Sequence, residues 1–468
     1  MKNKLLLTKL AMTIGLLLAG TSVFADDTRF ADFTPIATSA GPTIDEATPV
    51  TFGNPKFIQK SIADRETQLI DGKPNANPNL INPAAWDMNT VNETGRKKGQ
   101  FLFTVFEEGF GGVQRHDLKT GETDTIWQSQ TNHKSFDASF WTPWGTFITG
   151  EESWGAGSNN GRLFELKNPT TAPAITNPLS ATSNIGAVFV HQNVIPRTSH
   201  EGIQFDKDGN MYFIDELNGG NVYKYTPAAK MSQVKKGKAD YFARGTTSVL
   251  RVGDGNTPNA TGAYSWVPFT DANGNGLPGA VTITDVDKVF SVDARETANQ
   301  FEFKGTDYNR PEDLQIQTVK AKEYLYIATT GSNEVYRLDL KKQMISVFAN
   351  RSTIDLATGT AVGASLTSPD NLAVDHDGNI YIVEDRDGGV EDDIWFAKDL
   401  NKDGDLTDLG EGIGRWATNG TLGSEFSGLY FDPFNKNRAW VNIQHPLSGN
   451  DRTIEIKIAR SHDDDDAE

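Results

Sequence analysis

The chain has no cysteine among its 468 residues. This absence excludes disulfide bonds and thiolate metal ligands, so that only oxygen and imidazole ligands remain. Long apolar runs are missing after the first 25 residues, which excludes a membrane-spanning helix of about 20 residues. Basic residues are few, 44 against 62 acidic ones, and the net charge of −18 excludes nucleic acid and anionic membrane as expected partners. Acidity also serves solubility, so it favours cation binding only weakly.

The first 25 residues have the pattern of an export signal. Lys2, Lys4 and Lys9 precede or open an apolar run, and a small-residue cleavage site ends at Ala25. The leader has no twin arginine, which indicates the general secretory route. The sequence therefore predicts a periplasmic or secreted protein that acquires any metal outside the cytoplasm.

Short β-like segments recur along the rest of the chain. Residues 201–216 and 370–385 match almost position for position, each as a strand, an Asp-Gly turn, a second strand and a carboxylate pair. Looser copies at three other places and a further hairpin that begins at Gly112 bring the number to about six units, which predicts an all-β fold, a β-propeller of five to seven blades. We expect a signal peptide at residues 1–25 and an irregular segment that wraps the propeller at residues 26–100. The propeller itself is expected at residues 101–460 and an acidic disordered tail at residues 461–468.

Carboxylates stand at equivalent positions of these units. Glu201, Glu312 and Asp370 begin their units, and the pair Glu151-Glu152 follows a strand-like run. A single pair of this kind is more often a solvated turn. Innermost propeller strands begin at one end of the central channel, however, and a cluster of like charges there is costly unless cations neutralise it. The repeats therefore predict a metal site on the propeller axis.

Two cationic or imidazole side chains accompany the carboxylates. Arg310 precedes a proline-restrained turn and two acidic residues, so it offers a cation for a substrate anion beside metal ligands; the alternative is a surface ion pair. His200 and His445 flank the starts or ends of repeats, where a structural hydrogen-bonded imidazole is the commoner role.

One further segment resembles a calcium loop. It has oxygen side chains at positions one, three, five and seven and Gly404 at position six, although position twelve is Gly410 instead of Glu. A second segment starts in the same way at Asp271 but fails at position seven, which favours a simple turn. The first loop predicts a peripheral calcium site with the ligands Asp399, Asn401, Asp403 and Asp405.

Five motifs, in this order, resemble those of the PhoX-type alkaline phosphatases: TPWGTFITGEES, RTSHEG, RPEDL, SPDNLAVDHDGN and VNIQHP. The resemblance runs from about residue 101 to residue 446. It implies a six-bladed propeller that carries a cluster of iron and calcium ions and hydrolyses phosphomonoesters. It also implies a phosphate-binding role for Arg310 and metal-ligand roles for Glu151, Glu201, Glu312 and Asp370; Glu152, Asn371 and His445 occupy motif positions as well, the last as a candidate catalytic residue.

The chain departs from this family at the metal cluster. Family members commonly carry a metal-bridging cysteine where this sequence has Gly150, and they commonly use twin-arginine export. The remaining oxygen ligands favour Ca²⁺, with a second metal such as Fe, Mn or Mg left open, and a thiolate-bridged iron pair is not expected.

The sequence therefore predicts a monomeric, calcium-dependent phosphatase that hydrolyses small phosphomonoesters at alkaline pH. Two alternatives stay open. One is a non-catalytic, calcium-stabilised propeller that binds an extracellular partner, which the glycine at position 150 favours. The other is a lactonase or carboxylic-ester hydrolase on the same fold.

Overall fold

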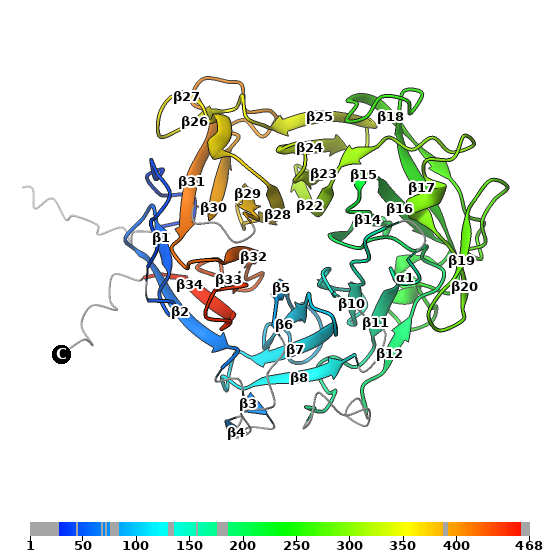
Figure 1. Ribbon diagram of the computed structural model, residues 1–468, viewed down its shortest axis with the longest axis horizontal. Coiled ribbons are helices and arrows are strands. Elements are labelled where there is room, and N and C mark those ends of the chain that lie inside the picture. The colour runs from blue at the N-terminus through cyan, green and yellow to red at the C-terminus, as the bar shows by residue number, and fades with distance from the viewer. Residues whose placement is uncertain are drawn as a thin grey trace, which may run out of the picture.

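The computed structural model describes residues 28–43, 45–66, 69–70, 73–74, 84–129, 135–155, 158–175, 186–386 and 392–459. The expected signal peptide and acidic tail lie outside these residues. The described chain is a β-propeller, in which the strands form a ring of blades around a central axis (Figure 1). The all-β prediction is confirmed. Among the described residues, no helix is long and apolar enough to cross a membrane.

The described strands form six blades, which follow the chain around the ring. Each blade begins with its innermost strand, and the later strands pair outward in antiparallel order. The first blade comprises β5 (Trp86–Val91), β6 (Phe101–Phe106), β7 (Gly112–Asp117) and β8 (Thr123–Gln128), and the second comprises β9 (Phe140–Trp141), β10 (Phe147–Gly150), β11 (Leu163–Leu166) and β12 (Phe189–His191). The third comprises β13 (Ile203–Phe205), β14 (Met211–Ile214), β16 (Val222–Pro227), β17 (Gly245–Val252) and β18 (Gly262–Pro268), and the fourth comprises β22 (Pro311–Val319), β23 (Lys322–Thr329), β24 (Glu334–Asp339) and β25 (Met344–Ala349). The fifth comprises β28 (Pro369–Val374), β29 (Ile380–Glu384), β30 (Asp392–Lys398) and β31 (Gly412–Asn419), and the sixth comprises β32 (Glu425–Phe431), β33 (Arg438–Gln444) and β34 (Arg452–Ile458).

The remaining described elements are short and decorate the blades. They are β1 (Val50–Phe52), which pairs with β31; the ribbons β3 (Leu69–Ile70) with β4 (Lys73–Pro74), β15 (Asn218–Gly220) with β21 (Tyr308–Asn309), β19 (Thr282–Thr284) with β20 (Phe290–Val292) and β26 (Ile354–Asp355) with β27 (Thr360–Ala361); and the helical turns α1 (Met231–Val234), α2 (Ala294–Thr297) and η1 (Gly363–Ser365).

The N-terminal part of the chain completes the ring. Strand β2 (Phe57–Asp64) pairs antiparallel with β34 and forms the outer strand of the sixth blade (Figure 1). Strand β5, which also precedes residue 101, is the innermost strand of the first blade. The region that sequence patterns describe as irregular therefore supplies two blade strands, because pairing with distant strands extends them where local alternation is weak.

The two clear repeats form the hairpins that their Asp-Gly turns predict. In the β13–β14 turn, Asp206 accepts hydrogen bonds from the main chain and side chain of Asn210 and from the Tyr212 hydroxyl. Asp375 makes the same contacts in the β28–β29 turn, with Asn379 and Tyr381. These aspartates are turn residues, which explains the repeat pattern without a metal ion.

The hydrophobic core is divided into layers that lie between neighbouring blades. Phe103 and Phe147, for example, pack across the interface of the first and second blades, and Tyr381 and Phe431 pack across that of the fifth and sixth. The inner strands β14 and β29 are buried along their whole length. Packing of this kind holds the starts of the six innermost strands in a fixed arrangement around the axis.

Candidate metal centre

A cavity of about 290 Å³ lies on the propeller axis, where the innermost strands begin. All six blades contribute to its wall. Its lining includes Arg310, His445, Trp154 and ten carboxylates, which are Asp87, Glu107, Asp137, Glu152, Glu201, Glu216, Glu312, Asp370, Asp385 and Glu425. Arg310 is the only Arg or Lys among the lining residues that the structure describes. The excess of negative charge is the dominant property of this cavity.

The carboxylates come from two positions in the blade repeat. One is the start of the innermost strand, as at Glu201, Glu312 and Asp370, and the other follows the second strand, as at Glu216 and Asp385. Both positions face the axis because the second strand runs antiparallel to the first and ends beside its start. The topology thus brings side chains more than 200 residues apart into one cavity.

Where two acidic residues follow a second strand, only one of them faces the cavity. Glu152, Glu216 and Asp385 line it, whereas the residue before each points to the other side, since neighbouring residues of an extended chain point in opposite directions. Glu384, for example, accepts hydrogen bonds from Thr367 N and Trp395 Nε1 beneath the cavity.

Glu151 is held on this far side by a buried ion pair. Its Oε1 accepts from Arg162 Nη2 at 2.6 Å and from Asn160 Nδ2 at 3.1 Å. Its Oε2 accepts from Arg162 Nε and from the main-chain N–H groups of Gly161 and Arg162 at 2.9–3.0 Å. Both oxygens are therefore occupied. The structure separates Glu151 from the cavity, against the expectation from sequence, and of the predicted pair it places only Glu152 there.

Asn371 also lies outside the cavity wall. Its Oδ1 accepts from Gly428 N at 2.6 Å and from Ser427 Oγ at 3.2 Å, and its Nδ2 donates to Asp370 Oδ2 at 3.1 Å. Asn371 therefore orients Asp370 and joins it to strand β32, which differs from the metal-ligand role that its motif position implies. Asp399, Asn401, Asp403 and Asp405 lie in the loop between β30 and β31, also outside the cavity.

Among the residues that the structure describes, three sets of side chains place ligand atoms within 4.8 Å of one another. The sets are Glu201 with Glu216 and Glu312, Asp87 with Glu107 and Asp137, and Glu107 with Glu425 and His445. Every member of these sets lines the cavity. The carboxylates that sequence analysis did not assign here are those of the first and sixth blades, together with Asp137 of the second blade and the second-strand residues Glu216 and Asp385. Their only sequence signal is an acidic residue beside a strand end, which is common in solvated turns.

Burial and mutual repulsion favour the protonated form of these acids. Burial is the main cause that raises the pKa of Asp87 to about 6 and that of Glu312 to about 8, although Arg310 lowers the latter. The pKa values of Glu201 and Asp370 lie well above the ordinary value for the same reason, with neighbouring carboxylates as the next cause. The cavity would therefore hold protons at neutral pH unless other cations replaced them.

The donor set fits hard divalent cations. Asp137 Oδ1 is buried without a hydrogen-bond partner, and Glu201, Glu216 and Glu312 are each at least 95% buried in side-by-side positions. Carboxylate oxygens are the preferred ligands of Ca²⁺, Mg²⁺ and Mn²⁺, and a bound cation removes the repulsion among them. The lining contains no sulfur, because the chain has no cysteine and Met side chains are absent from this wall.

Arg310 is anchored at the mouth of the cavity. Its Nη2 donates to Glu216 Oε1 at 2.7 Å, and its Nε lies 3.1 Å from Glu312 Oε1. The guanidinium also lies over the ring of Trp154, 5.0 Å from its centroid, and the Trp154 indole donates to Glu152. Arg310 remains 30% exposed. It is thus held beside the carboxylates while part of its guanidinium faces solvent.

His445 occupies the opposite side of the lining, directly after β33. It is about half exposed, and its Nε2 lies 3.8 Å from Glu425 Oε1 and 3.1 Å from Gln444 Nε2. Gln444 in turn donates to Glu107 at 2.6 Å. Of the residues that sequence analysis assigned to the site, the structure therefore brings together Glu152, Glu201, Glu312, Asp370, Arg310 and His445.

The sequence matches the family model of the alkaline phosphatase PhoX over residues 138–447. This chain belongs to the PhoX family. The matched residues include the cavity side chains of the second to sixth blades except Asp137, whereas Asp87 and Glu107 precede them.

No curated protein matches the chain. Solved structures with the same architecture include a gluconolactonase from Xanthomonas campestris (12% identity, 91% of this chain and 100% of that chain, TM-score 0.43). They also include virginiamycin B lyase from Staphylococcus aureus (10%, 86% and 100%, 0.39) and the calcium-binding protein regucalcin from Agrobacterium tumefaciens (9%, 81% and 92%, 0.39). At these identities and TM-scores the resemblances carry no information on activity.

Gly150, the last residue of strand β10, packs directly against His200. A Cβ atom added to Gly150 would lie 2.4 Å from His200 Cβ and 2.5 Å from its Cγ. His200 is fully buried, and neither ring nitrogen has a hydrogen-bond partner. Burial is the main cause that lowers the pKa of His200 to about 3, with Arg197 and Arg295 as further causes, so the imidazole is neutral. The His200 side chain thus occupies the space that a side chain at position 150 would need.

Gly150→Cys and Gly150→Ala should both lower the free energy of unfolding, by about 1–3 kcal/mol, because the added side chain would push His200 away from strand β10. His200→Ala should not relieve the contact, since its Cβ remains. Urea unfolding of the variants tests this, with Gly109→Ala as the control because a Cβ there meets nothing within 4 Å. An unchanged midpoint for Gly150→Cys would contradict the packing described here.

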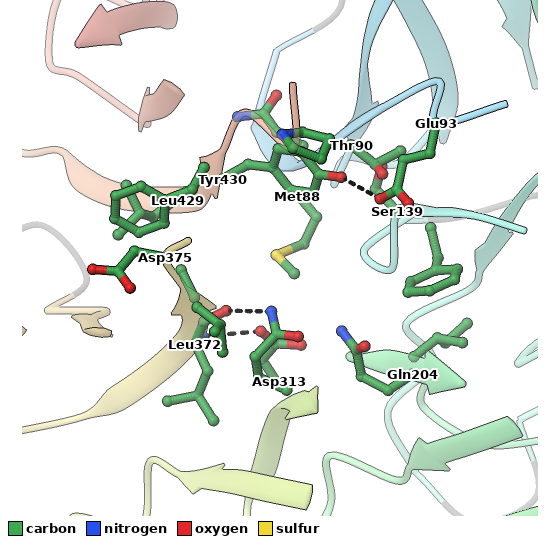
Figure 2. A pocket seen from close by; sticks show the side chains of 18 of the residues that line it. Met88, Thr90, Glu93, Ser139, Gln204, Asp313, Leu372, Asp375, Leu429 and Tyr430 are labelled. Carbon is green, nitrogen blue, oxygen red and sulfur yellow. Dashed lines mark hydrogen bonds between the residues drawn. The ribbon is translucent and has the colours of Figure 1, made fainter. Parts of the chain in front are cut away.

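A second cavity of about 380 Å³ lies further along the same inner strands. Figure 2 shows Met88, Gln204, Asp313 and Leu372 around it. Each of these residues follows a carboxylate of the acidic cavity by one to three positions in the sequence. Both oxygens of Asp313 accept main-chain hydrogen bonds, from Leu314 N at 2.6 Å and Leu372 N at 2.9 Å. The lining is mixed polar and apolar. The acidic cavity, and not this one, therefore has the composition of a metal centre.

Proposed function

We propose that this protein is an exported, calcium-dependent phosphatase that hydrolyses phosphomonoesters at alkaline pH. The observation that carries the proposal is the single cavity in which ten carboxylates surround one arginine. Membership of the PhoX family supplies the reaction class. We also propose that the protein is monomeric and acts in the periplasm or outside the cell, as the leader sequence indicates.

The carboxylates of the cavity would bind cations, and Arg310 would bind the substrate. Glu201, Glu216 and Glu312 would hold one cation, and the sets around Glu107 would hold others. Bound divalent cations would supply Lewis-acid polarisation of the phosphoryl group and a lower pKa for attacking water. Arg310 would bind a phosphoryl oxygen through the part of its guanidinium that faces solvent, and so stabilise charge in the transition state.

The size of the cavity favours a small substrate. Its volume of about 290 Å³ lies at or below the lower end of ordinary ligand sites, so it admits a phosphoryl group with its cations while the alcohol portion stays at the mouth. Trp154 is 45% exposed at this mouth and lies beside Arg310. The half-exposed His445 lies where it can hold a proton for the leaving alkoxide.

The alkaline optimum follows from the same electrostatics. Cations bind to ionised carboxylates, and protons compete with them until the pH approaches the raised pKa values of groups such as Glu312, at about 8. Metal affinity, and with it turnover, should therefore increase from neutral to alkaline pH.

A phosphatase assay with and without chelator tests the proposal. The mature protein, loaded with Ca²⁺, should release phosphate from aryl and sugar monophosphates between pH 7 and 11, and EDTA should abolish this activity reversibly. Bound metal with no phosphate release over this range would overturn the proposal and favour a binding protein. Turnover of lactones that inorganic phosphate does not inhibit would instead indicate the lactonase alternative.

A further inference from the structure

The loop between strands β30 and β31 carries a second cluster of acidic side chains, away from the axial cavity. It spans residues 399–411 at the outer part of the fifth blade. Five carboxylates belong to it, from Asp399, Asp403, Asp405, Asp408 and Glu411. The spacing of its first residues is that of a calcium loop, but an acidic cluster by itself is common on protein surfaces.

Asp399 provides the observation that points to a ligand. Only 6% of this residue is exposed. Its Oδ2 accepts a hydrogen bond from Gly404 N at 2.9 Å, so that the carboxylate is directed into the loop, whereas Oδ1 is buried without a hydrogen-bond partner. Leaving such an oxygen unsatisfied costs on the order of 1–3 kcal/mol, and a cation in the loop would satisfy it.

Glu411 brings a second buried carboxylate to the same end of the loop. It is 2% exposed; its Oε1 accepts a hydrogen bond from Leu400 N, the residue next to Asp399, at 2.8 Å, and its Oε2 accepts one from Asp408 N at 3.3 Å. In a calcium loop that connects two helices, the last acidic ligand is residue twelve of the loop, and residue twelve of this loop is Gly410. Because this loop leads into a strand, the glutamate one residue later is held at the residue next to the first ligand.

The middle of the loop is arranged around Asn401. Its Nδ2 donates to Asp403 Oδ2 and Asp408 Oδ2, both at 2.9 Å. Gly404 at position six has a φ of +89°, as the sharp turn of such a loop requires. Arg337 donates to the main-chain oxygen of Asp403 at 2.6 Å. Arg337 and Lys402 together oppose five carboxylates, so the local charge remains negative.

We propose that this loop binds one calcium ion, with Asp399 and Glu411 as its buried ligands and with Asn401 and Asp403 completing the side-chain set. Asp405 contributes its main-chain oxygen, as position seven does in loops of this type. The ion would join the two ends of the loop and stabilise the β30–β31 pair. This site is independent of the proposed phosphatase activity.

The loop that begins at Asp271 provides a matched comparison within the same chain. Asp271 Oδ1 accepts from Asn273 N and Asn275 N at 2.7 and 2.9 Å, and Oδ2 accepts from Asn275 Nδ2 at 3.0 Å. Both oxygens are satisfied and the residue is not buried. This loop is a turn, although its sequence starts like the other.

Limited proteolysis of the full mature protein tests the proposal at the loop itself. Leu400 and Leu409 are exposed, so chymotrypsin can cleave there when the loop opens. After removal of calcium with EGTA and its return at about ten times the Kd, linkage predicts about tenfold slower cleavage within residues 399–411. Asp399→Asn and Glu411→Gln should each lose this protection and about one bound Ca²⁺ per chain by equilibrium dialysis, whereas Asp271→Asn should keep both.

Calcium-independent cleavage in the wild-type loop, or full protection in Glu411→Gln, would overturn the proposal. Two variants, Asp399→Asn and Glu411→Gln, are measured so that the test still holds if one of them fails to fold. Phosphate release plays no part in either measurement, so failure of the phosphatase assay would leave this test intact, and the reverse also holds.

Discussion

Replacement of Glu312 by Gln is expected to remove a metal ion and to lower kcat/KM for phosphomonoesters by about 100-fold or more. The substitution keeps the size of the side chain but removes the charge from one of the three carboxylates that share a site. Metal content per chain, measured by elemental analysis, should fall together with the rate of p-nitrophenyl phosphate hydrolysis. Glu302→Gln, which removes one carboxylate from an exposed position, is the control.

Arg310→Ala separates substrate binding from metal binding. Because Arg310 pairs with Glu216 and Glu312 but is not itself a metal ligand, its loss should leave the metal in place or bound more tightly. The rate should still fall by about 100-fold, since no other Arg or Lys among the described lining residues can replace it. Equal metal loss in the two variants, or normal turnover by either one, would contradict the assignment of these roles.

Removal of the metal ions is expected to make the stability of the protein fall as the pH rises from about 5 to about 9. In the folded, metal-free protein the pKa of Asp87 is raised to about 6 and that of Glu312 to about 8, so the folded state holds protons that the unfolded state releases near pH 4. Each unit by which a pKa is raised corresponds to roughly 1.4 kcal/mol of lost stability at high pH. For Glu312 the loss begins above the ordinary pKa and is complete above about 8.

The metal-loaded protein should behave in the opposite way over this range, because ionised carboxylates bind cations and protons displace them. Urea unfolding at pH 5, 6, 7, 8 and 9, with EDTA and with Ca²⁺, measures both curves. Burial also raises the pKa of Asp313 to about 7 and that of Asp451 to about 6, away from the cavity. Asp313 and Asp451 titrate in both the metal-free and the metal-loaded protein. The difference between the two curves of stability against pH therefore reports on the cavity. Parallel curves would show that cations do not neutralise it.

Sequence reasoning succeeded where a local pattern has one structural solution. The Asp-Gly turns of residues 201–216 and 370–385 predicted their hairpins, and the equivalence of Glu201 and Asp370 within the repeat placed both at the axis. It did not find Asp87 or Asp137, because neither stands in a recognisable copy of the repeat. Their positions follow from pairing with strands elsewhere in the chain, such as that between β5 and β6.

The sequence by itself determined the all-β repeat architecture, the acidic character of the axis, the absence of sulfur ligands and the family. Only the tertiary structure decided which acid of each pair faces the cavity, as Glu152 does while Glu151 binds Arg162. It also decided that His200 fills the space beside Gly150 and that Glu411 binds the main chain of Leu400, next to Asp399. The physical reason is the same in each case. Adjacent side chains of a strand point in opposite directions, and long-range strand pairing, which no local pattern records, sets the direction of each.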